Sequence, residues 1–274
     1  MRIKINKMMR KGLVYLFAVL IFASCGEYNK ILKSTDYEKK YEYAKKYYEE
    51  KKYSKAYTIL EDILPVFRGT SRAEEALYLI AQSYYGAKDY ETAGQYFTTY
   101  YTSYPRGEFA ELARYYAGLG YYLDSPDPKL DQTGTYKAIN EFQLFLEYYP
   151  KSDKVEEAQN YLFELQDKLA EKEYLSAKLY YNLGDYQGNN YESAVITAEN
   201  ALREYPYTKH KEEFYILILR SRYDEAVKSV EEKKEDRLRE VVDEYYTYIN
   251  EFPEGKHIKE AKRIFESASK KLND

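Results

Sequence analysis

An eight-residue frame, Y-x-x-[AG]-x-x-Y-Y, occurs four times and constrains the fold of this chain more than any other feature. The copies lie at Tyr41–Tyr48, Tyr78–Tyr85, Tyr115–Tyr122 and Tyr174–Tyr181, and the first three begin 37 residues apart. On an α-helix, the first tyrosine, the small residue and the last tyrosine share one face. The small residue allows a neighbouring helix to approach closely. Repetition at a fixed period of this length predicts an array of similar helical units.

A second landmark is a small or β-branched residue at a fixed distance before a proline. Three alanines and one valine each lie twelve residues before a proline: Ala93 and Pro105, Ala138 and Pro150, Ala194 and Pro206, and Val241 and Pro253. The segment between them has a helical pattern, and proline predicts its end because the ring cannot continue a helix. Each unit is therefore predicted to contain a helix with a small central residue, a turn, and a second helix that stops before a proline.

This arrangement resembles the tetratricopeptide repeat, whose period is about 34 residues. The sequence therefore predicts an all-α tetratricopeptide-repeat superhelix of about five helix pairs, at roughly 36–70, 71–107, 108–152, 153–208 and 209–255. A terminal capping helix is expected at about 256–272, and a capping box formed by Thr35 and Glu38 is expected to open the first helix. Two longer connections, Asp124–Thr135 and Gln187–Asn190, contain glycine, and the first also contains proline; both are predicted to protrude as loops.

The N-terminus has the composition of a secretory signal peptide over residues 1–24, with five basic residues followed by the apolar run Leu13–Phe22. That run is too short to span a bilayer, which needs roughly 20 residues. Cys25 is the only cysteine, so it cannot form an internal disulfide. Ala23, Ser24 and Cys25 resemble the lipobox of bacterial lipoproteins, which implies a covalent lipid on Cys25 and a lipidated linker at 25–35. The alternative is an ordinary cleaved signal with an incidental cysteine.

The net charge of the chain excludes some partners. Without the five basic residues of the signal, 37 basic residues remain against 46 acidic ones, a net charge of −9. An acidic protein is a poor ligand for nucleic acid or for an anionic membrane surface. Attachment to a membrane is therefore expected through the lipid alone.

No catalytic motif is visible in the sequence. His210 and His257 lie far apart, in neither case within an H-E-x-x-H motif, and the chain has no nucleophile elbow, P-loop or dinucleotide fingerprint. Acidic pairs such as Glu74-Glu75 are typical of solvated helix faces. We therefore expect a protein that is not an enzyme and that has no metal or cofactor apart from the lipid.

The tyrosines are the candidate contacts for a partner. In the tetratricopeptide fold that the chain resembles, the first helix of each pair lines a concave groove, and the resemblance implies that the first and last tyrosines of the first three frames contact a peptide there. Rigid aromatic side chains with a polar tip suit such a binding surface. The same resemblance implies that the third tyrosines, Tyr47, Tyr84, Tyr121 and Tyr180, pack the first helix of each pair on the second and are core residues. The groove candidates, which include two polar neighbours, are Tyr41, Lys45, Tyr48, Tyr78, Gln82, Tyr85, Tyr115 and Tyr122.

Taken jointly, the lipobox, the five repeats, the insertion in the third repeat and the long helix entering the fourth resemble the BamD lipoproteins of the β-barrel assembly machinery. The resemblance implies a scaffold on the periplasmic face of the outer membrane. It also implies that N-terminal repeats (36–152) receive unfolded barrel substrates and that C-terminal repeats (153–274) bind a BamA-like barrel protein. Two alternatives remain open: a glycan-binding lipoprotein of the SusD-like type, and a generic periplasmic repeat adaptor.

Overall fold

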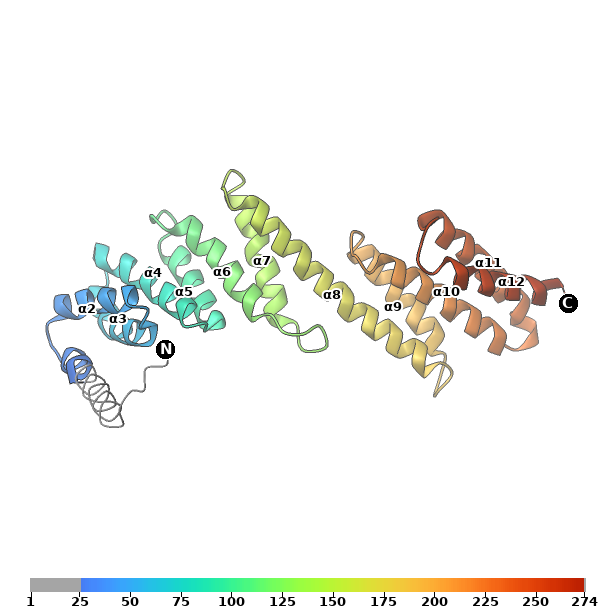
Figure 1. The fold of residues 1–274 in the computed structure, drawn as a ribbon, viewed down its shortest axis with the longest axis horizontal. Helices are drawn as coiled ribbons and strands as arrows, with labels where there is room; N and C mark the ends of the chain where they lie inside the picture. The colour runs from blue at the N-terminus through green and yellow to red at the C-terminus, as the bar shows by residue number, and fades with distance from the viewer. Residues whose placement is uncertain (1–25, 274) are drawn as a thin grey trace, which may run out of the picture. The chain divides into compact units, whose positions relative to one another are not determined.

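The computed structural model describes residues 26–273, and all regular secondary structure within them is helical (Figure 1). The helices follow in chain order: α2 (Tyr37–Glu49), α3 (Tyr53–Phe67), α4 (Ser71–Gly86), α5 (Tyr90–Ser103), α6 (Ala110–Asp124), α7 (Thr133–Tyr148), α8 (Val155–Leu183), α9 (Asn190–Glu204), α10 (Lys211–Lys228), α11 (Glu231–Glu251) and α12 (Ile258–Asn273). Helix pairs α2–α3, α4–α5, α6–α7, α8–α9 and α10–α11 correspond to the five predicted repeats. The predicted all-α tetratricopeptide class is confirmed.

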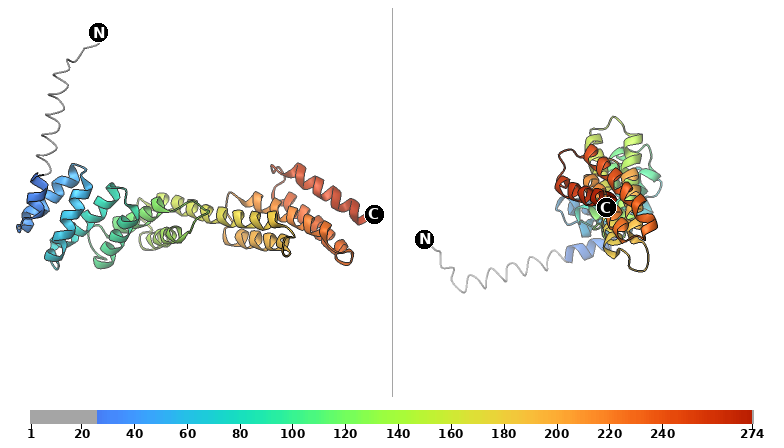
Figure 2. Two further views of the ribbon diagram at one scale, coloured as in Figure 1. Left: turned by 90° about the horizontal axis from the view of Figure 1, so that it is seen from below. Right: turned by 90° about the vertical axis from the view of Figure 1, so that its right-hand side faces the viewer.

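The chain forms two compact units, which are described separately. Unit 1 contains the residues up to Asp124 together with Asn140–Lys154; unit 2 contains Ser125–Ile139 and Val155–Asp274. Within unit 1, each helix from α2 to α6 packs against the next along the chain, and the same holds from α8 to α12 in unit 2 (Figure 2). Helix α7 contains the boundary between the units.

Local signals fix the helix ends. The side chains of Asp36, Asp89 and Asn189 accept hydrogen bonds from backbone N–H groups of the first helical turn and so cap α2, α5 and α9. The expected capping box at Thr35 was wrong, because Asp36, one residue later, supplies the capping oxygen. Helices α5, α9 and α11 end two residues before Pro105, Pro206 and Pro253, as the proline rule predicts.

Small residues in the frames let helices approach closely in unit 1. Ala44 and Ala81 are fully buried, and a Cβ atom on Gly118 would lie 2.9 Å from the Phe142 ring. Gly120 is more restricted, because a Cβ atom there would lie 2.9 Å from the backbone oxygen of Tyr90, which cannot move aside as a side chain can.

A polar junction closes the second repeat and recurs in the fifth. In α4–α5, the Tyr100 hydroxyl donates to Glu74 (2.6 Å), and the same carboxylate oxygen accepts from the backbone N–H of Glu108 (3.1 Å). In α10–α11, Tyr248 donates to Glu212 (2.7 Å), whose oxygen also accepts from the N–H of His257 (3.1 Å). Glycine follows the proline by two residues in both repeats, at Gly107 and Gly255, because a Cβ atom there would overlap this carboxylate and hydroxyl.

The described chain begins and ends with a helix that packs on its neighbouring repeat. The predicted capping helix is present as α12, with Ala261 and Ala268 fully buried and Phe265 stacked on Tyr245 at 4.4 Å. At the other end, residues 26–32 are helical, with Ile31 buried against unit 1. The expected linker at 25–35 is therefore helical over most of its length.

The insertion in the third repeat lies against a helix of unit 2. Lys168 of α8 donates to Ser125, and Lys172, one turn later, donates to the Leu130 carbonyl (3.1 Å). The buried Gln132 side chain donates to the carbonyls of Asp127 and Leu130, which fixes the loop internally.

Candidate binding surfaces

The first tyrosine of each N-terminal frame packs against the second helix of its own repeat. Tyr41 meets the Phe67 ring at 5.7 Å, and Tyr115 meets Phe145 at 5.6 Å; Tyr41 and Tyr115 are only 1% and 3% exposed. Both were expected to line a groove, and the structure corrects this: they are core residues. Tyr78 has the same role in part, since it packs on Tyr100 and stacks on Phe109 at 4.3 Å, but it remains partly exposed.

The tyrosines predicted to be core residues are buried or half-buried in unit 1 but not in unit 2. Tyr47 and Tyr121 are buried, and Tyr84 is half-buried between the stacked rings of Tyr57 (4.0 Å) and Tyr96 (5.3 Å). The prediction for Tyr180 was wrong, because it lies 39% exposed on the C-terminal half of the long helix α8.

A chain of side-chain hydrogen bonds joins the first two repeats on the surface of unit 1. Tyr48 of α2 donates to the Gln82 amide oxygen (2.7 Å), and the Gln82 nitrogen donates to the Tyr78 hydroxyl (2.8 Å). All three side chains are half-buried. Because an amide has two N–H groups and a carbonyl oxygen has two lone pairs, Gln82 retains one donor and one acceptor for a ligand. These are the groups that an extended peptide backbone requires.

Aromatic rings flank this chain. Tyr85 and Tyr116 meet edge to face at 5.5 Å, and Tyr116 stacks on Phe97 at 5.5 Å. Tyr116 was missed by the sequence analysis because it occupies a variable position of the frame, where the other copies have Glu or Leu. We call the half-buried residues Tyr48, Tyr78, Gln82, Tyr85 and Tyr116 the tyrosine face.

Two groove candidates, Lys45 and Tyr122, are not part of the tyrosine face. Lys45 is 3.6 Å from the Glu75 carboxylate and lies above the Tyr41 ring, so its charge is already partnered within unit 1. Tyr122 is half-buried near the end of α6.

The electrostatics of unit 1 keep the tyrosines neutral. Burial is the main cause that raises the pKa of Tyr78 to about 12, and it raises the pKa of Tyr48 as well. Tyr84 and Tyr96 both donate to Glu61 (2.8 and 2.6 Å), and their pKa values are raised by burial and by this carboxylate. These hydroxyls therefore remain protonated at physiological pH.

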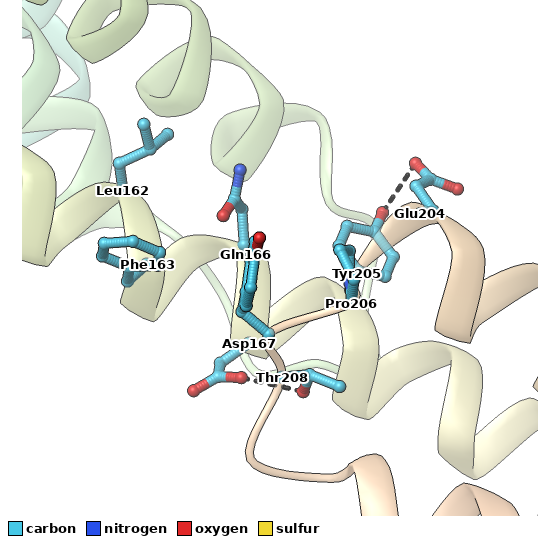
Figure 3. A pocket seen from close by; sticks show the side chains of 9 residues that line it. Leu162, Phe163, Gln166, Asp167, Glu204, Tyr205, Pro206 and Thr208 are labelled. Carbon is cyan, nitrogen blue, oxygen red and sulfur yellow. Dashed lines mark hydrogen bonds between the residues drawn. The ribbon is translucent and has the colours of Figure 1, made fainter.

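A cleft of about 540 Å³ lies in unit 2, between α8 and the connection from α9 to α10 (Figure 3). In Figure 3, Leu162 and Phe163 lie on one side and Glu204 and Tyr205 on the other. Gln166, Asp167, Pro206, Tyr207 and Thr208 complete the lining. Phe163 is 56% exposed and Tyr207 is 88% exposed, so the cleft has an apolar rim open to solvent. The sequence analysis did not identify this site.

The described residues offer little support for other kinds of site. Within residues 26–273 there is no cluster of His, Cys, Asp and Glu suited to a metal ion. Among the same residues, no helix combines the length and apolar character needed to cross a bilayer. The predicted signal and the lipidation site Cys25 lie outside the described part of the chain.

Comparison with known proteins identifies one family. A family model described as "YfiO: Outer membrane lipoprotein" matches residues 33–187, which is more than half of the chain. No curated protein matches the sequence. Among solved structures, the chain is similar to the TPR2AB domain of yeast Sti1 in its pHSP90 complex, with 15% identity and a TM-score of 0.39. That match covers 85% of this chain and 98% of the other.

Proposed function

Because the chain belongs to the YfiO, or BamD, family of outer membrane lipoproteins, we propose that it is a non-catalytic scaffold for the assembly of β-barrel proteins into the outer membrane. The observation that carries the proposal is the family match, which extends from the first repeat into the fourth. The stacked helix pairs support it, since such repeats offer extended surfaces for other proteins.

We propose that Cys25 carries the lipid and holds the chain on the periplasmic face of the outer membrane. A diacylglycerol group with a further acyl chain gives stable anchoring, because each buried methylene contributes about 0.8 kcal/mol. The acidic composition offers no second, electrostatic anchor on an anionic surface.

We propose that the tyrosine face of unit 1 receives unfolded segments of barrel proteins. Strands of such barrels alternate apolar and polar residues. The rings of Tyr85 and Tyr116 offer contacts to apolar side chains, and the spare donor and acceptor of Gln82 offer contacts to the peptide backbone. The C-terminal repeats are proposed to bind the periplasmic part of a BamA-like barrel protein.

The test of the tyrosine face keeps the packing rings in place. In a Gln82→Ala variant, the Tyr48 and Tyr78 hydroxyls lose their bridge and the ligand loses one donor and one acceptor. We expect the affinity for a ten-residue peptide of alternating apolar and polar residues to fall about fivefold to tenfold. Gln95→Ala, on an exposed position of α5, is the matched control and is expected to bind normally. If Gln82→Ala and Gln95→Ala bound the peptide with equal affinity, the tyrosine face would not be the site that receives barrel segments.

Co-purification separates the proposed function from its rivals. The full chain, solubilised from outer membranes in mild detergent, is expected to retain a large barrel protein with periplasmic repeats. A sugar transporter in its place would favour the SusD-like alternative, and a cell-wall hydrolase would favour a generic adaptor.

A further inference from the structure

The cleft in unit 2 lies at the proline junction of the fourth repeat, which has no aromatic residue five positions before its proline. Five residues before the proline, the second, third and fifth repeats have Tyr100, Phe145 and Tyr248, whereas the fourth repeat has Ala201. Two residues after the proline, Thr208 stands where the second and fifth repeats have glycine. The fourth junction is therefore built differently from the others.

The replacement removes one ring partner at the junction. In the second repeat, Tyr78 packs on Tyr100, the ring at this position. Tyr78 also stacks on Phe109, four residues after the proline. In the fourth repeat, the corresponding Tyr174 keeps a partner at that position, His210, and packs on Phe214 of α10, but it has no ring in place of Tyr100. The large ring that closes the other junctions is absent beside Tyr205, a residue that lines the cleft.

Hydrogen bonds within unit 2 orient the carboxylates of the cleft. Asp167 accepts from the Thr208 hydroxyl (2.8 Å) and from the backbone N–H of Lys209 (3.0 Å). Glu204 accepts from the Tyr205 hydroxyl (2.9 Å). Asp167 is thus held by two hydrogen bonds before any ligand arrives, which lowers the entropic cost of binding at this side of the cleft.

The two carboxylates differ in their counter-charges. Asp167 has Lys209 at 3.7 Å. Glu204 has no Lys, Arg or His nitrogen within 4.0 Å in the described chain, and neither does Glu173, its half-buried neighbour. Burial and the negative charge of Glu204 both raise the pKa of Glu173. The cleft therefore has unbalanced negative charge next to an exposed apolar rim.

We propose that this cleft binds a polypeptide segment of a partner protein in which an aromatic side chain is adjacent to a lysine or arginine. The aromatic ring enters between Phe163 and Tyr207, and the cation meets Glu204. A polypeptide combines both groups within one short stretch, whereas an anionic lipid headgroup or an acidic glycan would be repelled by the carboxylates. A volume of about 540 Å³ is within the range of roughly 300–1,000 Å³ typical of ligand sites. This inference does not depend on the tyrosine face.

The test uses the full chain in detergent and four blocked ten-residue Gly-Ser peptides, each with one central pair: Phe-Lys, Ala-Lys, Phe-Glu or Phe-Gln. With 4-fluorophenylalanine as the aromatic residue, and a fluorinated alanine in the Ala-Lys peptide, fluorine NMR reports binding of each peptide directly. We expect the Phe-Lys peptide to bind at least about fivefold more tightly than the other three, because they lose the ring or the charge.

Two variants assign the binding to the cleft. Glu204→Gln is expected to reduce the preference for Phe-Lys over Phe-Gln to nearly one, and Tyr207→Ala to weaken Phe-Lys about tenfold. Tyr207 is 88% exposed, so its replacement leaves the fold intact. The matched controls, Glu266→Gln and Tyr186→Ala, lie at exposed positions of unit 2 outside the cleft and are expected to bind normally.

Three results would overturn the proposal: equal binding of Phe-Lys and Phe-Glu, equal binding of Phe-Lys and Ala-Lys, or unchanged affinity in both cleft variants. The peptide measurements are separate from the proposed scaffold function. If Gln82→Ala binds the alternating peptide more weakly but binds the Phe-Lys peptide normally, both sites are supported. A negative result at one site leaves the result at the other unaffected.

Discussion

Several partly buried carboxylates of unit 1 accept hydrogen bonds from tyrosine hydroxyls, whereas several in unit 2 face guanidinium, ammonium and imidazole groups. Each unit also has an exception: Lys40 donates to Asp62 in unit 1, and Tyr248 donates to Glu212 in unit 2. Glu61 binds Tyr84 and Tyr96, and Glu141 accepts from Tyr101 with both oxygens. In unit 2, Glu260 forms a bidentate pair with Arg220, with both N–O distances 2.7 Å. Glu213 contacts Lys256 and His257, and Glu225 contacts Arg237 at 2.9 Å.

The same repeat fold thus tolerates two kinds of polar contact between helices. A neutral phenol brings one donor and a large apolar ring, so it contributes burial and satisfies a carboxylate at once. An arginine satisfies two oxygens but must be partly desolvated together with its partner. Unit 1 should therefore be sensitive to conditions that ionise phenols, and unit 2 to changes in its cationic side chains.

Alkaline pH should give the largest difference between the units. Burial raises the folded pKa of Tyr78 and Tyr101 to about 12, while the unfolded value is about 10. Because the folded pKa is raised, the contribution of these groups to stability is complete below about pH 10 and is lost as the pH rises toward about 12. Further tyrosines of unit 1 have a pKa raised in the same direction: Tyr41, Tyr84, Tyr96, Tyr100 and Tyr121.

We expect unit 1 to lose its helices first between about pH 10 and 12. Tyrosinate absorbance and circular dichroism should change together, and brief subtilisin digestion with mass spectrometry should locate the first cleavages before Asp124. Unit 2 also contains tyrosines whose pKa is raised by burial, to about 12 for Tyr181 and in the same direction for Tyr174, Tyr205, Tyr215 and Tyr248. Its arginines, however, remain protonated in this range. If the first cleavages fell within α9–α12, unit 1 would not be the more alkali-sensitive unit, and the contrast between the units would be wrong.

The sequence predicted the architecture well because its signals are local. Proline, small residues and helical periodicity each act within one or two turns, and together they define the helix pairs. They do not show which neighbour covers a given helix face. Tyr41 and Tyr115 were therefore assigned to a groove, although the aromatic residues that bury them, Phe67 and Phe145, lie on the next helix along the chain. Aligning the repeats on their prolines would have shown Ala201 as the exception, a signal that was available but unused.

Replacing the glutamates of the polar junctions, Glu74 and Glu212, should have a smaller effect on stability, and the loss should be equal in the two units. Glu74→Ala removes the acceptor of the fully buried Tyr100, and Glu212→Ala does the same to Tyr248. Each leaves a buried hydroxyl and a backbone N–H without their acceptor, so we expect a loss of about 2 kcal/mol or more in local stability. Native-state hydrogen exchange of α5 and α11 measures the two losses separately.

Exposed glutamates of the same units are the controls for this pair. Glu49→Ala and Glu266→Ala are each expected to change stability by less than about 0.5 kcal/mol. A large loss for Glu74→Ala with none for Glu212→Ala would show that the junction itself differs between the units, beyond their other polar contacts.

The smallest effect is expected from a charge-conserving change at Arg220 in unit 2. Arg220→Lys keeps the positive charge near Glu260 but replaces two parallel hydrogen bonds by at most one, because an ammonium group cannot match a carboxylate with a planar fork. The pair is about a quarter exposed, with side-chain exposures of 26% and 29%, so solvent screening reduces its worth; we expect a loss of about 1 kcal/mol. The same change at Arg239, 64% exposed and paired with Glu235 at the surface, is the matched control and should cost close to nothing. Thermal unfolding of unit 2, followed by hydrogen exchange of α10 and α12, is the measurement. Equal losses of stability for Arg220→Lys and Arg239→Lys would show that bidentate geometry contributes little to the stability of unit 2. The polar contacts of unit 2 would then differ from the phenol contacts of unit 1 in their charge alone.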